Sequence, residues 1–298
     1  MTNCKLVFIH GRAQEFKDAK DLKATWISAF ERGLSKSDLS LPIPEGQIQF
    51  PYYGQTLHDL TNNKDAEDAA DVIIRGGADD QELEEFAADY FGELKERFDL
   101  NQSKLREAGG DADVIKRGLP NWEWVQTILR GIDQFVPGAS SASVAIFTND
   151  VYQYLTNIGM QVDIDEGVQE AFDPTAKTVV VSHSLGTVVA YNILRKEADQ
   201  KGWAIPLHVT LGSPLGVRAI RERLKPLKRP QAVSSWFNAM DEGDVVALYA
   251  LTPSRFGVTP PIENKTDVEN QTDNQHGITG YLDDKEVAQR IYDALVQD

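Results

Sequence analysis

The segment 178–191 (TVVVSHSLGTVVAY) restricts the fold of this chain more than any other. Residues 178–181 are all β-branched, which is typical of a buried strand, and the residues from Gly186 onward read as a helix. Only a five-residue turn separates the two. A strand that turns directly into a helix is the repeating unit of sheets whose parallel strands are covered by helices. The segment therefore predicts an α/β fold.

The rest of the chain supports that fold class, because short apolar runs alternate with longer amphipathic stretches. We expect a mostly parallel central sheet flanked by helices. The predicted strands are residues 5–9, 47–53, 178–181, 205–211 and 233–240, and the predicted helices are 19–34, 186–196 and 284–296. Pro51 weakens the second strand at its end, because proline lacks the N–H that a ladder needs.

The middle of the chain differs from both ends. No convincing strand occurs between residues 55 and 165, whereas 82–98, 121–135 and 143–157 read as helices. Residues 55–115 hold 17 acidic and 6 basic side chains, for which a solvated helix face is the simplest explanation. We expect residues 1–54 and 165–298 to form the α/β core and residues 55–164 to form a helical insertion over one end of the sheet.

Composition excludes several kinds of protein. The chain has 298 residues with 41% hydrophobic residues, enough for a large core, and Cys4 is its only cysteine, so a Cys-rich metal site is ruled out. Its net charge of −16 would repel nucleic acid and anionic membranes. No apolar run approaches the ~20 residues of a membrane span, and no leader is recognisable, so we expect a soluble cytoplasmic protein. The sequence specifies no oligomeric state.

Ser184 stands at the centre of the five-residue turn Ser-His-Ser-Leu-Gly. Its hydroxyl would project at the carboxyl end of the sheet, next to the backbone N–H groups that open the following helix. A turn this tight needs small residues two positions before and after the central serine, and Ser182 and Gly186 satisfy that. The alternative is that Ser182 or Ser184 merely caps the helix.

This turn resembles the nucleophile elbow of the α/β-hydrolase superfamily, in the variant found in lipase- and esterase-like members. It departs from the usual G-x-S-x-G pattern because Ser182 occupies the first glycine position. The resemblance covers residues 1–54 and about 165–298. It implies an α/β-hydrolase fold with residues 55–164 as a helical cap, and a catalytic triad in the chain order serine, acid, histidine.

A serine hydroxyl needs a neighbouring base, and the resemblance places that base just before the last helix. His276 lies there in the polar loop 274–277, for which the simpler explanation is a solvent-facing histidine. Each of the other histidines has a competing interpretation: His10 ends the first strand, His58 lies in the insertion, His183 points away from the serine, and His208 packs within the sheet.

The base in turn needs a carboxylate. Asp244 resembles the family acid because Gly-Asp-x-Val follows a late strand, whereas Asp241 comes directly off that strand and is the alternative; Glu242 is a poor third. We favour Asp244.

The oxyanion of an acyl-transfer intermediate needs fixed donors. The resemblance assigns one to the backbone N–H of Leu185 and the other to the loop that begins at Gly11, where the donor is Arg12 or a following residue such as Ala13. His10 would orient this loop, and the Arg12 side chain would either meet a substrate anion or form a surface salt bridge. His10, Tyr53 and Ser213 are weaker candidates for substrate contact, since a core aromatic and a plain turn explain Tyr53 and Ser213 equally well.

The resemblance implies a serine hydrolase that cleaves small-molecule carboxylic esters through an acyl-enzyme. The same triad also serves amidases, peptidases, thioesterases and acyltransferases, and a catalytically silent binding module is a third alternative. No phosphate-binding loop, dinucleotide fingerprint or HExxH motif is present, so we expect no metal or organic cofactor.

Overall fold

A parallel sheet forms the centre of the molecule. The computed structural model describes residues 4–11, 18–54, 81–117 and 121–297. Within them, six strands are arranged in the order β2-β1-β3-β4-β5-β6, and every neighbouring pair is parallel. The strands are β1 (Cys4–Ile9), β2 (Ile48–Gln49), β3 (Lys177–His183), β4 (Ile205–Leu211), β5 (Val233–Ala239) and β6 (Glu263–Lys265). The α/β fold with a parallel central sheet is confirmed.

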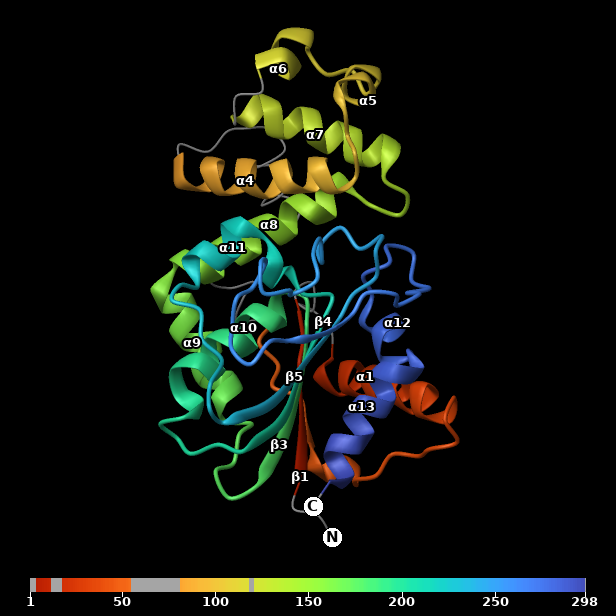
Figure 1. Cartoon of the computed structure of the whole chain (residues 1–298), viewed down its shortest axis with the longest axis vertical. Helices are drawn as coiled ribbons and strands as arrows, with labels where there is room; N and C mark the ends of the chain where they lie inside the picture. Colours follow the sequence, from red (N-terminus) through yellow and green to blue (C-terminus); the bar gives the residue numbers. More distant parts are fainter. Residues whose placement is uncertain (1–3, 12–17, 55–80, 118–120, 298) are drawn as a thin grey trace.

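Helices cover both faces of this sheet (Figure 1). One face carries α1 (Ala19–Ser35), α12 (Ile278–Leu282) and α13 (Lys285–Val296), and the other carries α9 (Ile158–Gln169), α10 (Leu185–Ile193) and α11 (Arg218–Arg223). Side chains alternate along β1 accordingly: Leu6 and Phe8 pack in the cluster that includes α1 and α13, and Val7 and Ile9 pack in the cluster that includes α10. Both sides of β1 are therefore apolar, as in other doubly covered parallel strands.

Further helices lie beyond the end of the sheet at which the strands finish (Figure 1). They are α4 (Gln81–Arg97), α5 (Gln102–Glu107), α6 (Ala112–Arg117), α7 (Trp122–Phe135) and α8 (Ser141–Thr156). The predicted helices 82–98, 121–135 and 143–157 match α4, α7 and α8 closely, whereas α5 and α6 were not predicted. Residues 55–80 of the expected insertion lie outside the described residues.

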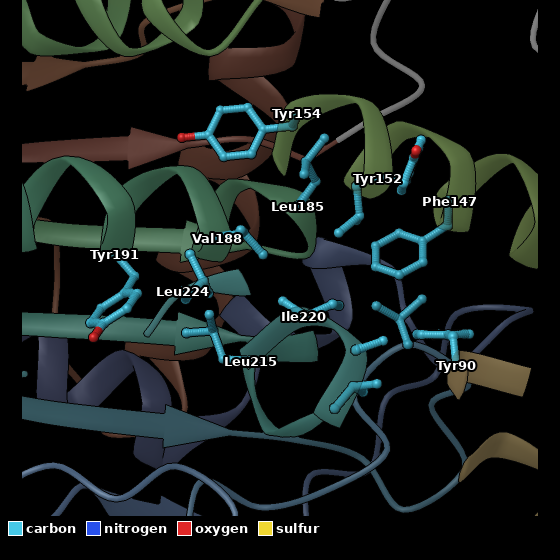
Figure 2. Close-up of a cluster of buried hydrophobic side chains, with 14 of the residues drawn as sticks. Tyr90, Phe147, Tyr152, Tyr154, Leu185, Val188, Tyr191, Leu215, Ile220 and Leu224 are labelled. Carbon is cyan, nitrogen blue, oxygen red and sulfur yellow. The ribbon is translucent and has the colours of Figure 1, made fainter. Parts of the chain in front are cut away.

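Helix α4 is tied to the core by its polar side chains as well as its apolar stripe. Arg255 pairs with Glu93 at 3.0 Å, and Arg218 pairs with Asp89 at 2.5 Å. Figure 2 shows the apolar contact nearby, where Tyr90 of α4 lies in one buried cluster with Leu185 and Ile220 of the core helices. The helices at the end of the sheet thus share a core with the sheet itself.

Two sequence-based strand predictions differ from the structure. The predicted strand 47–53 is paired only at Ile48 and Gln49, and Pro51 lies just beyond the paired residues. Strand β6 was missed because its sequence, Glu-Asn-Lys, has no apolar residue for a pattern to detect. Among the described helices, none has both the length and the apolar character that crossing a bilayer requires.

The strand order changes direction at β1. The chain leaves β1 for β2 on one side and returns to β3 on the other side of β1. In open α/β sheets, ligands bind outside the carboxyl ends of the strands at such a switch point. The residues that follow β1 and β3, beginning at His10 and Ser184, meet there.

Candidate active site

Ser184 occupies a strained backbone conformation between β3 and α10. Its φ of 56° and ψ of −129° are costly for a residue with a Cβ, on the order of 1–3 kcal/mol. The Ser184 N–H donates to the carbonyl of Leu211 at 3.1 Å, and the Thr187 N–H donates to the carbonyl of Ser184 at 2.9 Å. The Ser184 side chain makes no capping hydrogen bond to α10. Its hydroxyl therefore does not serve as the helix cap that the alternative interpretation proposed.

The turn is closely packed against the loop after β1. A Cβ on Gly186 would lie 2.4 Å from the carbonyl oxygens of both Ile9 and His10, and a Cβ on Gly11 would lie 2.8 Å from the Cβ of Ser184. Ser182 fits the first small position because its hydroxyl is absorbed by the sheet, where it donates to the carbonyl of Val209 at 3.0 Å. The His208 ring lies near that hydroxyl, buried within the sheet as expected.

A chain of hydrogen bonds runs from Ser184 through His276 to Asp244. His276 Nε2 lies 2.9 Å from Ser184 Oγ, and His276 Nδ1 lies 2.7 Å from Asp244 Oδ2. Because a carboxylate accepts, Nδ1–H donates to Asp244 and leaves the Nε2 lone pair facing the serine hydroxyl. The structure thus brings together the three side chains that the sequence analysis favoured.

Asp244 is fully buried yet well supplied with donors. Its Oδ1 accepts from the N–H groups of Val246 and Ala247 at 2.8 and 3.1 Å, and its Oδ2 accepts from His276 and from the Tyr281 hydroxyl. Burial acts to raise the pKa of Asp244, but the charge of His276 and these hydrogen bonds together hold it below its usual value. The carboxylate therefore stays ionised beside the imidazole.

Asp241, the alternative acid, is engaged elsewhere. Its Oδ1 accepts from the Gly243 N–H and its Oδ2 accepts from the Asn270 N–H, both at 2.7 Å. These bonds join the loop after β5 to the loop that leads to His276. Asp241 therefore stabilises the backbone of the loop that contains Asp244, and it makes no hydrogen bond to His276 in the structure.

His183 was expected to point away from the serine, and the structure shows that its ring lies beside His276. Its ring lies 4.7 Å from the His276 ring, and its Nε2–H donates to the carbonyl of His276 at 2.7 Å. Burial, followed by the neighbouring His276, lowers the pKa of His183 to about 3, so it is a neutral donor. The alternation along β3 contained the signal, because it places His183 with Val181 on the face that the C-terminal helices cover.

His10 and Tyr53 hold the loop after β1. The Tyr53 N–H donates to His10 Nε2 at 3.1 Å, so Nδ1–H of the same ring donates to the carbonyl of Gly11 at 2.6 Å. Burial lowers the pKa of His10 to about 4, and the Tyr53 hydroxyl donates to the His10 carbonyl. Both side chains are thereby committed to the loop. Arg12 lies outside the described residues.

Two further residues predicted from the sequence, Leu185 and Ser213, lie at the starts of helices. Leu185 is the first residue of α10, so its N–H has no carbonyl one turn earlier in the helix to bind. Ser213 caps the short turn at Pro214–Gly216, accepting from the Leu215 N–H, and its hydroxyl is 2.8 Å from that of Thr187. The Ser213 side chain is thus occupied beneath the turn.

A cavity of about 390 Å³ opens over Ser184 and His276. Its walls come from α1, the start of α8, the loop after Asp244 and the loop around His276. The apolar lining is Trp26, Val144, Phe147, Val245, Val246 and Ile278, and polar side chains are contributed by Ser140, Ser143 and Asn274. None of these residues was singled out from the sequence, because nothing local marks a helix start as a cavity wall.

Within the described part of the chain, no three His, Cys, Asp or Glu side chains gather in a way that would hold a metal ion. Comparisons with protein-family models, with curated proteins and with solved structures found no match for this chain. The geometry of the site is therefore what indicates its chemistry.

Proposed function

We propose that this chain is a serine hydrolase of the α/β-hydrolase type that cleaves carboxylic esters, with the helices α4–α8 as a cap. The observation that carries the proposal is the continuous hydrogen-bond chain from Ser184 through His276 to Asp244 at the base of the cavity. Among the described residues, His276 is the side chain to which the Ser184 hydroxyl bonds. A strained serine, an imidazole and a buried carboxylate joined in this order have few roles other than nucleophilic catalysis.

The chemistry follows from the direction of those hydrogen bonds. Ser184 Oγ attacks the ester carbonyl carbon while its proton passes to His276 Nε2. Asp244 holds the imidazole in the tautomer that can accept this proton and stabilises the resulting imidazolium. When the tetrahedral intermediate collapses, the C–O bond to the alcohol breaks and the leaving oxygen takes the proton from Nε2. Water then attacks the acyl-enzyme by the same route and releases the acid and Ser184.

The developing oxyanion needs N–H donors next to the serine. The N–H of Leu185 opens α10, where the helix dipole adds to its attraction for negative charge. Gly11 lies against Ser184 from the other side, and the absence of a side chain there leaves room for a substrate oxygen. We assign the second donor to the loop that Gly11 begins, as the resemblance implies.

The cavity lining favours an uncharged substrate with an apolar acyl chain over a charged one. Val144 and Phe147 of α8 and Val245 and Val246 after the acid form an apolar wall that suits an acyl chain. Among the described lining residues, the ionisable side chains are the two histidines, so a charged substrate would meet no fixed countercharge from them.

A fluorophosphonate probe tests the nucleophile directly, because it forms a covalent bond with an activated serine. The wild-type chain should be labelled, Ser184→Ala should not, and Ser184→Ala should lose ester turnover on the order of a thousandfold or more. Ser182→Ala is the matched control, since that hydroxyl belongs to the same turn but bonds within the sheet; the variant should stay labelled. Absence of labelling in the wild type would leave a silent binding module as the better interpretation.

Substrate class is tested with p-nitrophenyl esters of increasing acyl length and with the anilide of the best acyl group. Ester hydrolysis should exceed anilide hydrolysis. Faster cleavage of the anilide would replace the ester proposal with an amidase.

A further inference from the structure

Tyr281 lies in α12, five residues after His276, and its side chain is fully buried. Its hydroxyl donates to Asp244 Oδ2 at 2.6 Å and accepts from the Asp241 N–H at 3.1 Å. The phenol thus reaches the carboxylate that orients the proposed catalytic base, although it is not one of the three triad residues.

The two oxygens of Asp244 have different partners. Oδ1 accepts two backbone N–H groups, from Val246 and Ala247, and these fix the position of the carboxylate. Oδ2 is shared by His276 Nδ1 at 2.7 Å and by Tyr281 at 2.6 Å. Because the backbone already anchors the carboxylate, the bond from Tyr281 acts mainly on the charge available to His276.

We propose that Tyr281 is a positioning residue that sets the basicity of His276 through the shared oxygen of Asp244; this inference rests on the proposed hydrolase function. A phenol that donates to Oδ2 withdraws negative charge from it, and the carboxylate then stabilises the protonated imidazole less. The proton taken from Ser184 is therefore passed on more readily to the leaving group. Asp244 is fully buried, so no solvent contact dilutes the effect.

The other groups around the pair do not obscure this role. His183 faces His276 from the end of β3 and, with its pKa lowered to about 3 by burial and by His276, stays neutral above that pH. Tyr90 of α4 donates to the carbonyl of Val245, and burial, followed by Asp244, raises its pKa well above the usual value. Burial and Asp244 do the same for Tyr281, so it remains a donor. The oxygens of Asp241 are held by backbone N–H groups.

On the surface of the same loop, the guanidinium of Arg97 donates to the carbonyl of Glu242. Arginine stays protonated throughout the range in which a histidine titrates, so its charge is constant there. The acid limb of the activity profile therefore reports the His276–Asp244 pair.

The test is the pH dependence of the second-order rate of fluorophosphonate labelling and of kcat/KM, compared between the wild type and Tyr281→Phe. The variant keeps the ring and removes one donor from Oδ2, which leaves more charge for the imidazolium. The midpoint of the acid limb should move to higher pH by about 0.5 unit. An acid limb that superimposes on that of the wild type would overturn the proposal and reduce Tyr281 to a packing residue.

Tyr154→Phe is the matched control. Tyr154 also donates to a buried carboxylate at 2.6 Å, that of Asp165, but it takes no part in the site. This variant should lose comparable stability and keep the wild-type acid limb. A shift as large as that of Tyr281→Phe would show that any lost tyrosine–aspartate bond has the same effect, which contradicts the proposal.

A second variant keeps the test decisive if Tyr281→Phe does not fold. Incorporating 3-fluorotyrosine at position 281 makes the phenol more acidic and the donor stronger, so the acid limb should move to lower pH; movement to higher pH or none refutes the inference. A wild type that neither labels nor turns over esters refutes the proposed function instead, so the two failures are distinguishable.

Discussion

Asp165 is a buried carboxylate that the proposed chemistry does not use. It lies in α9 and accepts from the Tyr154 hydroxyl at 2.6 Å and from Asn192 Nδ2 at 2.9 Å, which joins α8, α9 and α10. Burial raises the pKa of Asp165 from 3.8 to about 6, although Tyr154, Lys196 and Asn192 each lower it in part. Desolvation therefore destabilises the charged form of Asp165 more than its hydrogen-bond partners and Lys196 stabilise it.

The sign of the effect on stability follows from linkage. A carboxyl with a higher pKa in the folded than in the unfolded chain binds its proton more tightly when folded. Its contribution to stability is full below pH 3.8 and is lost as the pH rises through about 6. At 1.36 kcal/mol for each pKa unit, the total loss is about 3 kcal/mol. Asp165→Asn removes the charge and should remove this dependence.

Urea unfolding of the wild type and of Asp165→Asn between pH 4.5 and pH 7.5 measures the effect. The free energy of unfolding of the wild type should fall by about 2 kcal/mol relative to the variant across this range. Altered hydrogen bonds add an offset that does not change with pH, so only the slope is predicted. Glu166→Gln removes an exposed carboxylate from the same helix and should keep the wild-type slope. Parallel profiles for the wild type and Asp165→Asn would refute the reasoning.

Two further predictions concern the site and its turn. Asp244→Asn should lower kcat by about 10⁴-fold because it favours the wrong imidazole tautomer. Asp241→Asn should keep kcat within about tenfold of the wild type and lower Tm. If Asp241→Asn lowered kcat more than Asp244→Asn, Asp241 would be the catalytic acid instead. Gly186→Ala should destabilise the fold by about 1–3 kcal/mol or more and abolish probe labelling, because its Cβ would meet two carbonyl oxygens at 2.4 Å. Gly167→Ala, where a Cβ meets nothing within 4 Å in α9, is the control: it should unfold at or above the wild-type temperature and keep wild-type labelling.

Local patterns predicted the fold class and the turn that contains Ser184, whereas the family resemblance suggested which residues meet it. The strand, the turn around Ser184 and the helix follow one another in the sequence, so a short window of sequence contains the whole motif. Alternating strands and helices are likewise local signals. The bond between His276 and Asp244 spans 32 residues, and the family resemblance, not periodicity, suggested that pairing.

Features that depend on distant contacts were not predictable in this way. Strand β6 is recognised by its pairing with β5, since its own residues are polar. Tyr281 bonds to another segment at the site, and nothing in its neighbouring residues indicates that. For His183, the alternation along β3 indicates the face of the sheet but not the bond to the His276 carbonyl. The cavity wall combines Trp26 of α1 with Phe147 of α8, which are far apart in the chain and become neighbours of the same space only after folding.

Helix α4 binds the loop that contains Asp244, and this limits how far the protein could be shortened. Tyr90 donates to the carbonyl of Val245 at 3.0 Å, and Arg97 donates to that of Glu242 at 2.9 Å, so one helix spans the backbone on both sides of the acid. Excising α4 would free that backbone along with the outer helices. A minimal version of this protein cut back to its strands and their flanking layers would keep its serine but lose the brace that steadies its carboxylate.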